Sequence, residues 1–189
     1  YAVEQIQAAE RLGFDVAWVA QHHFHEAEGG LPSPLVLLGH VAALTTRIRL
    51  GTAIVTLPLE EPLRVAEDAA VLSLLSDDRF ELGIGSGGTA TSFPPFGHDP
   101  ADRAQINARH TERLVAALRG DTLTTDDGAL YPAAPNLLRT LWGATFSADG
   151  ARRIGAAGFG LMLSRTQPRG PGQRTLSDVQ APIVDAYRA

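Results

Sequence analysis

The sequence predicts an α/β protein built around a parallel β-sheet. Helix-like and strand-like segments alternate about every thirty residues, which is the pattern of repeated βαβ units. Short apolar runs such as residues 16–20 have no polar face, as expected of strands that are buried on both sides. Units of this kind build either an open doubly wound sheet or a closed barrel, and no internal repeat decides between the two.

The first half of the chain begins with a helix and then alternates regularly. Ile6 and Ala9 lie at helical spacing, and Gly13 follows as a helix stop. Proline suits the first turn of a helix, so Pro34 and Pro62 are expected to begin the next two helices. The expected elements are helices at 3–12, 34–46 and 62–76, and strands at 16–20, 48–57 and 80–84.

The second half continues the alternation after a loop rich in proline and glycine. Asp99 and Pro100 have the character of an N-cap and a first-turn proline, and Ser147 that of a second N-cap. Residues 126–128 predict the turn of a surface hairpin. The expected elements are helices at 99–118, 148–157 and 179–187, a hairpin at 121–131, and strands at 141–144 and 161–163.

Size and composition narrow the possible functions. A chain of 189 residues suits one core, so residues 1–189 are expected to form a single domain. The net charge of -5 is spread along the chain, which argues against binding to nucleic acid or to an anionic membrane. The absence of cysteine excludes disulfides, thiolate metal sites and cysteine nucleophiles. No signal peptide or membrane-length apolar run is visible, so a cytoplasmic location is expected.

Residues 83–88 form a glycine-rich segment directly after an expected strand. The segment matches the dinucleotide-binding fingerprint letter for letter. In that fold the glycines open a helix, whereas residues 89–97 contain a proline pair and no helical pattern. A turn whose backbone amides approach a ligand is therefore favoured, and a purely structural loop is the simpler alternative.

Two further clusters follow expected strands. Ser147 can be a simple helix cap, or part of a phosphate site that uses the free amides at a helix N-terminus. His22 and His23 are adjacent on an extended segment, so one can face a cavity while the other packs away from it. Glu26 and Glu28 are the nearby carboxylates, and they lie in a loop without the spacing of a metal site. One histidine is therefore expected to handle protons or face a substrate, and no metal is expected.

Six short motifs lie in order between residues 13 and 83. They are GFDVAW at 13–18, QHHF at 21–24, RIRLGTA at 47–53, LP at 57–58, PLRVAED at 62–68 and RFELG at 79–83. Together they resemble the bacterial luciferase-like flavin monooxygenases. That resemblance implies a (β/α)8 TIM barrel with the active site at the C-terminal ends of the strands, where the three clusters fall.

The resemblance also implies roles for particular residues. The family binds reduced FMN, or in one branch a deazaflavin, and His22 matches a histidine that acts as general base. The peptide between Ala53 and Ile54 falls where the family has a cis bond against the flavin. Gly85 lies in the loop beside the flavin, and Ser147 matches a serine that contacts its phosphate.

The chain departs from the family pattern at several positions. Ser86 stands where luciferase has an arginine that binds the FMN phosphate, so Arg165, at the end of another expected strand, is a candidate replacement. Gln21 stands where a glutamate is usual, and Glu61 where a histidine is frequent. These changes bear on the substrate class and on the details of catalysis.

The resemblance implies that the barrel is incomplete. The first strand and the last strands are absent from the chain, so that five of the eight strands of the full barrel are expected here. The chain also begins at Tyr1 without a methionine, and we expect that it is truncated at both ends. A five-stranded remnant would expose apolar edges, so it is not expected to be stable alone.

The expected function is a flavin-dependent monooxygenation of a small organic substrate by O2. The resemblance implies a separate flavin reductase that supplies reduced FMN, and a homodimer formed through helices near the second and third strands. Two alternatives remain open: a deazaflavin-dependent dehydrogenase, and a non-catalytic flavin-binding or partner subunit. The substrate lies beyond what the sequence shows, because variable loops select it.

Overall fold

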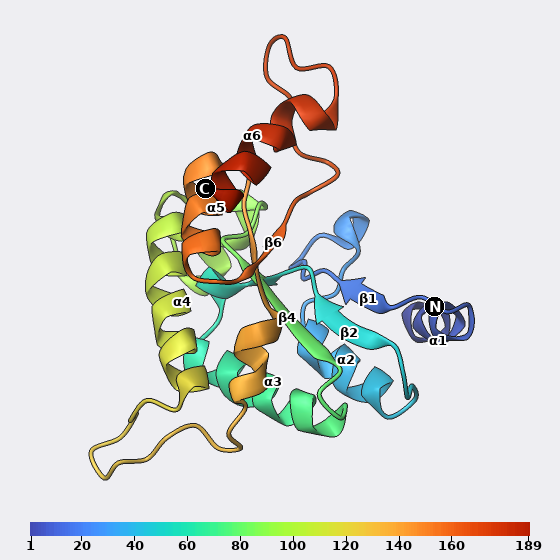
Figure 1. The fold of residues 1–189 in the computed structure, drawn as a ribbon, viewed down its shortest axis with the longest axis vertical. Coiled ribbons are helices and arrows are strands. Elements are labelled where there is room, and N and C mark those ends of the chain that lie inside the picture. Colours follow the sequence, from blue (N-terminus) through green and yellow to red (C-terminus); the bar gives the residue numbers. More distant parts are fainter.

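The centre of the molecule is a curved, all-parallel sheet that forms part of a barrel wall. The computed structural model describes residues 1–189, and Figure 1 shows the sheet with helices along its outer side. The strand order is β1-β2-β4-β5-β6, and the short β3 pairs with β4 beyond the end of β2. The strands are β1 (Val16–Val19), β2 (Arg49–Thr52), β3 (Val55–Thr56), β4 (Phe80–Gly85), β5 (Leu141–Ala144) and β6 (Gly160–Met162).

A helix lies between each main pair of consecutive strands, so every strand runs in the same direction. The helix α2 connects β1 to β2, α3 connects β3 to β4, α4 connects β4 to β5 and α5 connects β5 to β6. The helices are α1 (Ala2–Arg11), α2 (Pro34–Ala42), α3 (Pro62–Leu75), α4 (Arg103–Arg119), α5 (Ala148–Ala156) and α6 (Leu176–Arg188). Parallel βα units of this kind place their loops after the strands at one common end.

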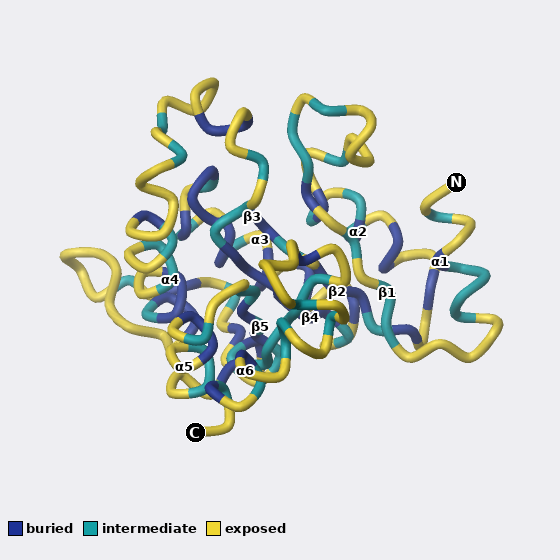
Figure 2. The backbone as a smooth tube through the Cα atoms, turned by 90° about the horizontal axis from the view of Figure 1, so that it is seen from above, coloured by how far each residue is buried: buried dark blue, intermediate teal, exposed yellow.

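The main core lies between the sheet and its helices. Along β4, Phe80 and Leu82 point to the helical side and belong to a cluster of 25 buried apolar residues. Glu81 and Gly83 alternate with them and point to the inner, concave side. Figure 2 shows that the buried stretches follow the strands and the helix faces next to them, while the outer loops are exposed.

Bulky side chains and glycines alternate on the inner face of the sheet. Trp18 of β1 and Trp142 of β5 meet edge to face, with ring centroids 5.6 Å apart. The Trp142 Nε1–H donates to Glu81 Oε2 at 2.6 Å, and the same carboxylate pairs with Arg49. A Cβ at Gly51 would lie 2.2 Å from the Trp18 ring, so only glycine leaves room for that ring. These residues fill the inner side of the sheet next to the C-terminal ends of the strands.

Most of the predicted elements are present, and three differ from expectation. The strand expected at 48–57 is two strands, β2 and β3, separated by a cis peptide between Ala53 and Ile54. The hairpin expected at 121–131 is a loop without strands, in which Gly128 accepts from the backbone N–H of Leu123 at 2.7 Å. Asp99 caps a 3-10 turn, and the long helix α4 begins only at Arg103.

Candidate functional site

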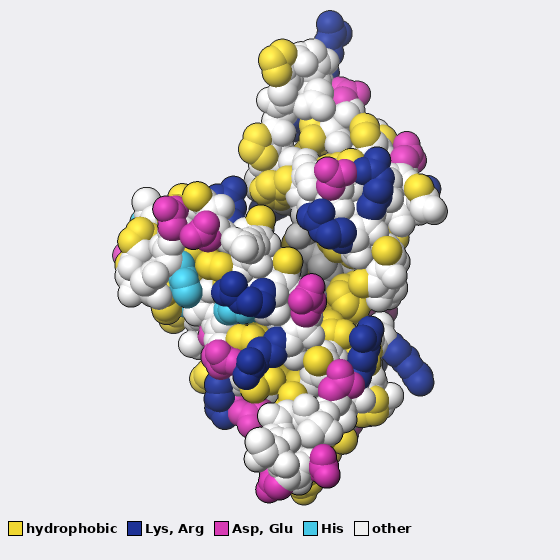
Figure 3. Space-filling model, turned by 90° about the vertical axis from the view of Figure 1, so that its left-hand side faces the viewer, with side chains coloured by type: hydrophobic (Ala, Val, Ile, Leu, Met, Phe, Trp, Pro, Cys, Tyr) yellow, Lys and Arg dark blue, Asp and Glu magenta, His cyan; other side chains and the backbone are white.

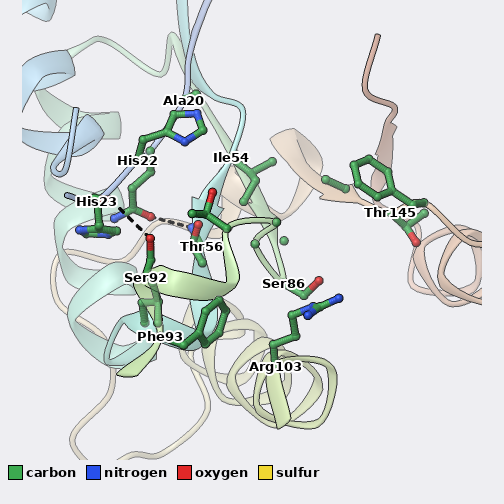
Figure 4. Close-up of a pocket in the computed structure, with 18 of the residues that line it drawn as sticks. Ala20, His22, His23, Ile54, Thr56, Ser86, Ser92, Phe93, Arg103 and Thr145 are labelled. Atoms are coloured by element: carbon green, nitrogen blue, oxygen red, sulfur yellow. Dashed lines mark hydrogen bonds between the residues drawn. The ribbon is translucent and has the colours of Figure 1, made fainter. Parts of the chain in front are cut away.

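A cavity of about 480 Å³ lies at the C-terminal ends of the strands, within the range of small-molecule and cofactor sites. Its lining comes from the segments that follow β1, β2, β4 and β5, with α4 along one side. In Figure 4 the histidines occupy one end, and Ser86, Arg103 and Thr145 the other. We call these the histidine end (His22 and His23) and the arginine end (Ser86, Arg103, Thr145 and Ser147).

Six of the seven residues predicted for the site line this cavity. They are His22, Ala53, Ile54, Gly85, Ser86 and Ser147. The structure does not bring Arg165 to them: it is exposed in the loop after β6 and does not line the cavity. The three clusters identified in the sequence therefore meet in one place, because parallel strands carry their C-terminal ends to one edge.

His22 is held by its backbone and by one ring nitrogen. Its backbone N–H donates to Leu31 O at 2.9 Å, and its Nδ1 lies 3.2 Å from Glu28 Oε2. The side chain is about one-third exposed at 34%. No protein group hydrogen-bonds to Nε2, so this nitrogen can exchange a proton with a ligand in the cavity.

His23 also reaches the cavity, although its surroundings differ from those of His22. Its ring packs edge to face against Phe96, with centroids 4.9 Å apart, and its Nε2 is buried without a hydrogen-bond partner. Burial lowers the pKa of His23 below its usual value, and the negative charge of Glu60 opposes this shift. The neutral ring is therefore favoured at neutral pH.

Gln21 fixes the strand end that carries the two histidines. Its side chain is buried and uses both ends of the amide: Oε1 accepts from the backbone N–H of Thr56 at 2.7 Å. Its Nε2 donates to Glu60 Oε1 at 2.7 Å and to Pro32 O at 3.0 Å. Because Thr56 lies in β3 and Glu60 follows it, Gln21 fixes the histidine segment relative to the next part of the sheet.

The arginine end combines a positive charge with a helix N-terminus. Figure 4 shows the side chain of Arg103 extending from α4 toward Ser86. Ser147 is the N-cap of α5, as predicted, and its Oγ accepts from the Gly150 N–H at 3.1 Å. Thr145 Oγ1 accepts from the Ser147 N–H at 3.1 Å. This end can bind an anion through the guanidinium and the first-turn amides of α5.

Sequence reasoning missed Arg103 and Thr145. Arg103 lies at the start of α4, which follows a 3-10 turn, and it lines the cavity. Thr145 lies between two predicted features, the strand end at Ala144 and the cap at Ser147, and this adjacency was the available signal.

The rest of the surface adds little to this site. No group of three or more His, Asp or Glu side chains lies close enough together to hold a metal ion. Figure 3 shows basic and acidic side chains interspersed over one face of the molecule, without a continuous patch of one sign. None of the helices combines the length and the apolar character that a membrane crossing requires.

Comparison with known sequences gives one family for nearly the whole chain. The family model described as Luciferase-like monooxygenase matches residues 1–188. Protein y4vJ of Sinorhizobium fredii is 33% identical over an alignment of 172 residues that covers 86% of this chain and 48% of that protein. Limonene 1,2-monooxygenase of Rhodococcus erythropolis is 31% identical over 89% of this chain and 45% of its own length. The chain thus spans about half the length of these curated relatives.

Solved structures share the fold at low identity. Monooxygenase RslO1 from Streptomyces bottropensis superposes with a TM-score of 0.83 and 23% identity, over 99% of this chain and 59% of that one. The oxygenating constituent of 3,6-diketocamphane monooxygenase from Pseudomonas putida was solved with FMN. It superposes with a TM-score of 0.77 and 16% identity, over 99% of this chain and 56% of that one. An F420-dependent secondary alcohol dehydrogenase, solved with an F420-acetone adduct, superposes with a TM-score of 0.77 and 20% identity, over 98% of this chain and 59% of that one.

Proposed function

The chain belongs to the luciferase-like monooxygenases, and we propose that it uses reduced FMN and O2 to oxidise a small organic substrate. The observation that carries the proposal is the cavity at the strand ends. One end of it offers an imidazole and the other a guanidinium beside a helix N-terminus. This arrangement suits a ligand that has a reactive ring at one end and a phosphate at the other.

The glycine segment and the arginine end of the cavity wall suit a flavin. A Cβ at Gly85 would lie 3.2 Å from Ile54 Cδ1 and 3.3 Å from Ala144 Cβ, so a side chain there would take up space in the cavity. Gly85, Ala53 and Ile54 would hold the ring system, and Arg103 with the amides of α5 would bind the phosphate. A bound reduced flavin supplies the electrons for the reaction with O2.

The residues of the chain position ligands, exclude water and move a proton. Leu59 and Phe93 give the cavity an apolar part that can hold an organic substrate and exclude water. His22 Nε2 would take up or release the substrate proton, because it has no protein partner. Gln21 and Glu60 hold the segment in place without entering this step.

Arg103 bears on the alternative of a non-catalytic subunit. Luciferase has an arginine at the position of Ser86, and Ser86 carries no charge. This difference favours the non-catalytic alternative, in which the phosphate site is lost. Arg103 supplies a positive charge at the same end of the cavity from a different element. A phosphate site built on Arg103, together with His22, supports the catalytic alternative.

The choice between FMN and a deazaflavin rests on the phosphate end. The two structural relatives described above were solved with FMN and with an F420 adduct, so the shared fold serves both. Arg103 is the only arginine of the cavity wall, which suits the single phosphate at the end of FMN. We therefore infer FMN, and direct binding measurements distinguish it from F420.

A separate reductase is proposed as the source of reduced FMN. The glycine segment at 83–88 ends β4 and leads into 3-10 turns, and α4 begins only at Arg103. A dinucleotide site places the pyrophosphate at a helix that follows its glycines directly. The segment therefore has the geometry of a ligand-facing turn and does not provide a site for a nicotinamide cofactor.

A second copy of the chain is proposed to cover apolar residues on the outer helices. On α3, Val71, Leu74 and Leu75 are exposed by 44%, 68% and 62%, and Val36 on α2 is exposed by 76%. Exposed apolar side chains gathered on neighbouring helices are typical of oligomer interfaces. Sedimentation velocity of the protein and of Leu74→Glu tests this homodimer, which the substitution is expected to weaken.

The experiment for the catalytic proposal compares His22→Asn with His40→Asn. His40 is exposed on α2 and lies outside the cavity, so it is the matched control. With reduced FMN supplied by a flavin reductase, substrate-dependent O2 uptake should fall roughly 100-fold in His22→Asn, the usual size of a general acid/base contribution. Reduced-FMN affinity should stay unchanged. Equal uptake by the two variants would exclude His22 as the proton-handling residue.

A further inference from the structure

One carboxylate oxygen joins the His22 ring to the loop that follows β4. Glu28 Oε2 lies 3.2 Å from His22 Nδ1 and accepts the hydroxyl hydrogen bond of Thr89 at 2.8 Å. Glu28 lies in the loop after β1, whereas Thr89 follows the glycine segment and lines the cavity. Two loops from different strands therefore meet at the same atom beside His22.

We propose that Glu28 is a positioning residue for His22, which sets the tautomer of its imidazole and, through Thr89, ties its orientation to the loop that follows β4. The inference rests on the acid/base role proposed above for His22. Glu28 itself does not line the cavity, so it acts through the histidine.

The tautomer follows from the chemistry of the two partners. A carboxylate can only accept hydrogen bonds, so the His22 nitrogen that faces Glu28 must carry the hydrogen. In the neutral ring, Nδ1–H leaves a lone pair on Nε2, the nitrogen without a protein partner. The contact therefore leaves Nε2 ready to take a proton from a ligand in the cavity.

The charge of Glu28 is maintained by its surroundings. The Thr89 hydroxyl lowers the pKa of Glu28, and the hydrogen bond with His22 and the neighbouring His25 lower it further, against slight desolvation. Glu28 is thus ionised at neutral pH. A protonated carboxyl could donate to Nδ1 and stabilise the opposite tautomer, so the low pKa supports the assigned direction.

Further contacts connect the same two loops. His25 Nε2 lies 2.8 Å from Thr91 Oγ1, and Ser92 Oγ donates to His23 O at 3.4 Å. Phe96 packs against both His23 and Phe24, with centroids 4.9 Å and 5.8 Å apart. Ser86, Thr89 and Ser92 line the cavity and belong to the loop that follows β4. A ligand that contacts this loop would therefore also hold Thr89, and through it Glu28, the partner of His22.

The test measures the His22 tautomer directly, without cofactor. Two-bond ¹H–¹⁵N NMR spectra at about pH 8.5, well above the pKa of about 6.5 of free imidazole, report which ring nitrogen carries the hydrogen. The chain has six histidines, and the signal missing in His22→Asn identifies His22. We expect Nδ1–H as the main form in the wild type and in Glu26→Gln, the control carboxylate of the same loop.

The substitutions of the two partners should change this result. Glu28→Gln and Thr89→Val are expected to give a mixture of both tautomers, and Thr89→Ser, which keeps the hydroxyl, should restore Nδ1–H. Nε2–H as the main form in the wild type, or an unchanged ratio in Glu28→Gln, would overturn the proposal. A merely structural role of Glu28 would not move the tautomer ratio.

Turnover provides the second readout and separates this inference from the proposed function. Glu28→Gln is expected to lower kcat about tenfold, the lower end of the effect of removing an orienting partner, with reduced-FMN affinity unchanged. Unchanged kcat despite a shifted tautomer would overturn the positioning role. Loss of the proposed function appears differently, as full turnover in His22→Asn, whatever the NMR result for Glu28→Gln.

Discussion

The backbone N–H of Thr56 donates to Gln21 Oε1 at 2.7 Å, and this buried contact joins the end of β1 to β3. The other end of the Gln21 amide is also bonded, because its Nε2 donates to Glu60 Oε1 at 2.7 Å. A glutamate at position 21, which is usual in the family, could not donate to Glu60. The Gln21 side chain and the carboxylate at Glu60 are therefore a matched pair in this chain.

Replacing Gln21 with glutamate should destabilise the protein by about 2–3 kcal/mol, because it removes two donors and places two carboxylates together. The double variant Gln21→Glu/Glu60→Gln should recover most of the loss, since the amide introduced at position 60 could donate to the carboxylate introduced at position 21. Urea unfolding at neutral pH measures both effects. A double variant less stable than Gln21→Glu alone would contradict the pairing.

Removal of the Arg103 charge should weaken the binding of reduced FMN. Loss of one charge-assisted hydrogen bond to phosphate is worth about 1.5–3 kcal/mol, or roughly 10- to 100-fold in Kd. Arg109→Ala is the control, because Arg109 is exposed on the same helix and does not line the cavity. Anaerobic fluorescence titration compares the variants. Equal affinities would show that Arg103 does not bind the phosphate.

Two glycines of β4 should respond differently to alanine. A Cβ at Gly83 would lie 2.0 Å from Thr52 O, so Gly83→Ala should cost about 2–4 kcal/mol of stability through displacement of backbone. At Gly85 the nearest atoms are side chains at 3.2 Å and 3.3 Å, so the fold should tolerate alanine while reduced FMN binds more weakly. Thermal unfolding and flavin titration separate these effects. Equal losses of stability would contradict the distinction.

Glu10 should make stability depend on pH in the acid range. Its carboxylate accepts from the backbone amides of Ile48, Arg47 and Thr46, which lower the pKa of Glu10 below its usual 4.5. A lowered folded-state pKa stabilises the native state above about pH 4.5, and this contribution disappears as the pH falls through the folded-state pKa. Glu10→Gln should therefore be less stable at neutral pH and approach the wild type in acid. A constant difference across this range would contradict the account.

The fold was predictable where local signals agreed with the tertiary structure. The apolar runs at β1, β4 and β5 and the cap at Ser147 correctly located the strands and α5. The resemblance also implied the cis peptide at Ala53, which the structure contains. The predicted hairpin near Asp126 failed because a turn signal alone does not supply a partner strand.

The site was only partly predictable for a related reason. Residues directly after strands, such as His22 and Ser86, were found because parallel strands bring their ends together. Arg103 was missed because Asp99 caps a 3-10 turn and α4 begins only at Arg103, so that this residue lies in the first turn of the helix. Arg165 does not line the cavity, and Arg103, at the start of α4, is the arginine that does.

An anaerobic fluorescence titration measures whether this cavity binds reduced FMN, as proposed. The protein is titrated separately with reduced FMN, oxidised FMN and the deazaflavin, and the Arg103→Ala variant is measured in parallel. Reduced FMN is expected to bind saturably, more tightly than the deazaflavin and in a manner that depends on Arg103. Binding of the deazaflavin alone, or of neither cofactor, would contradict the proposal.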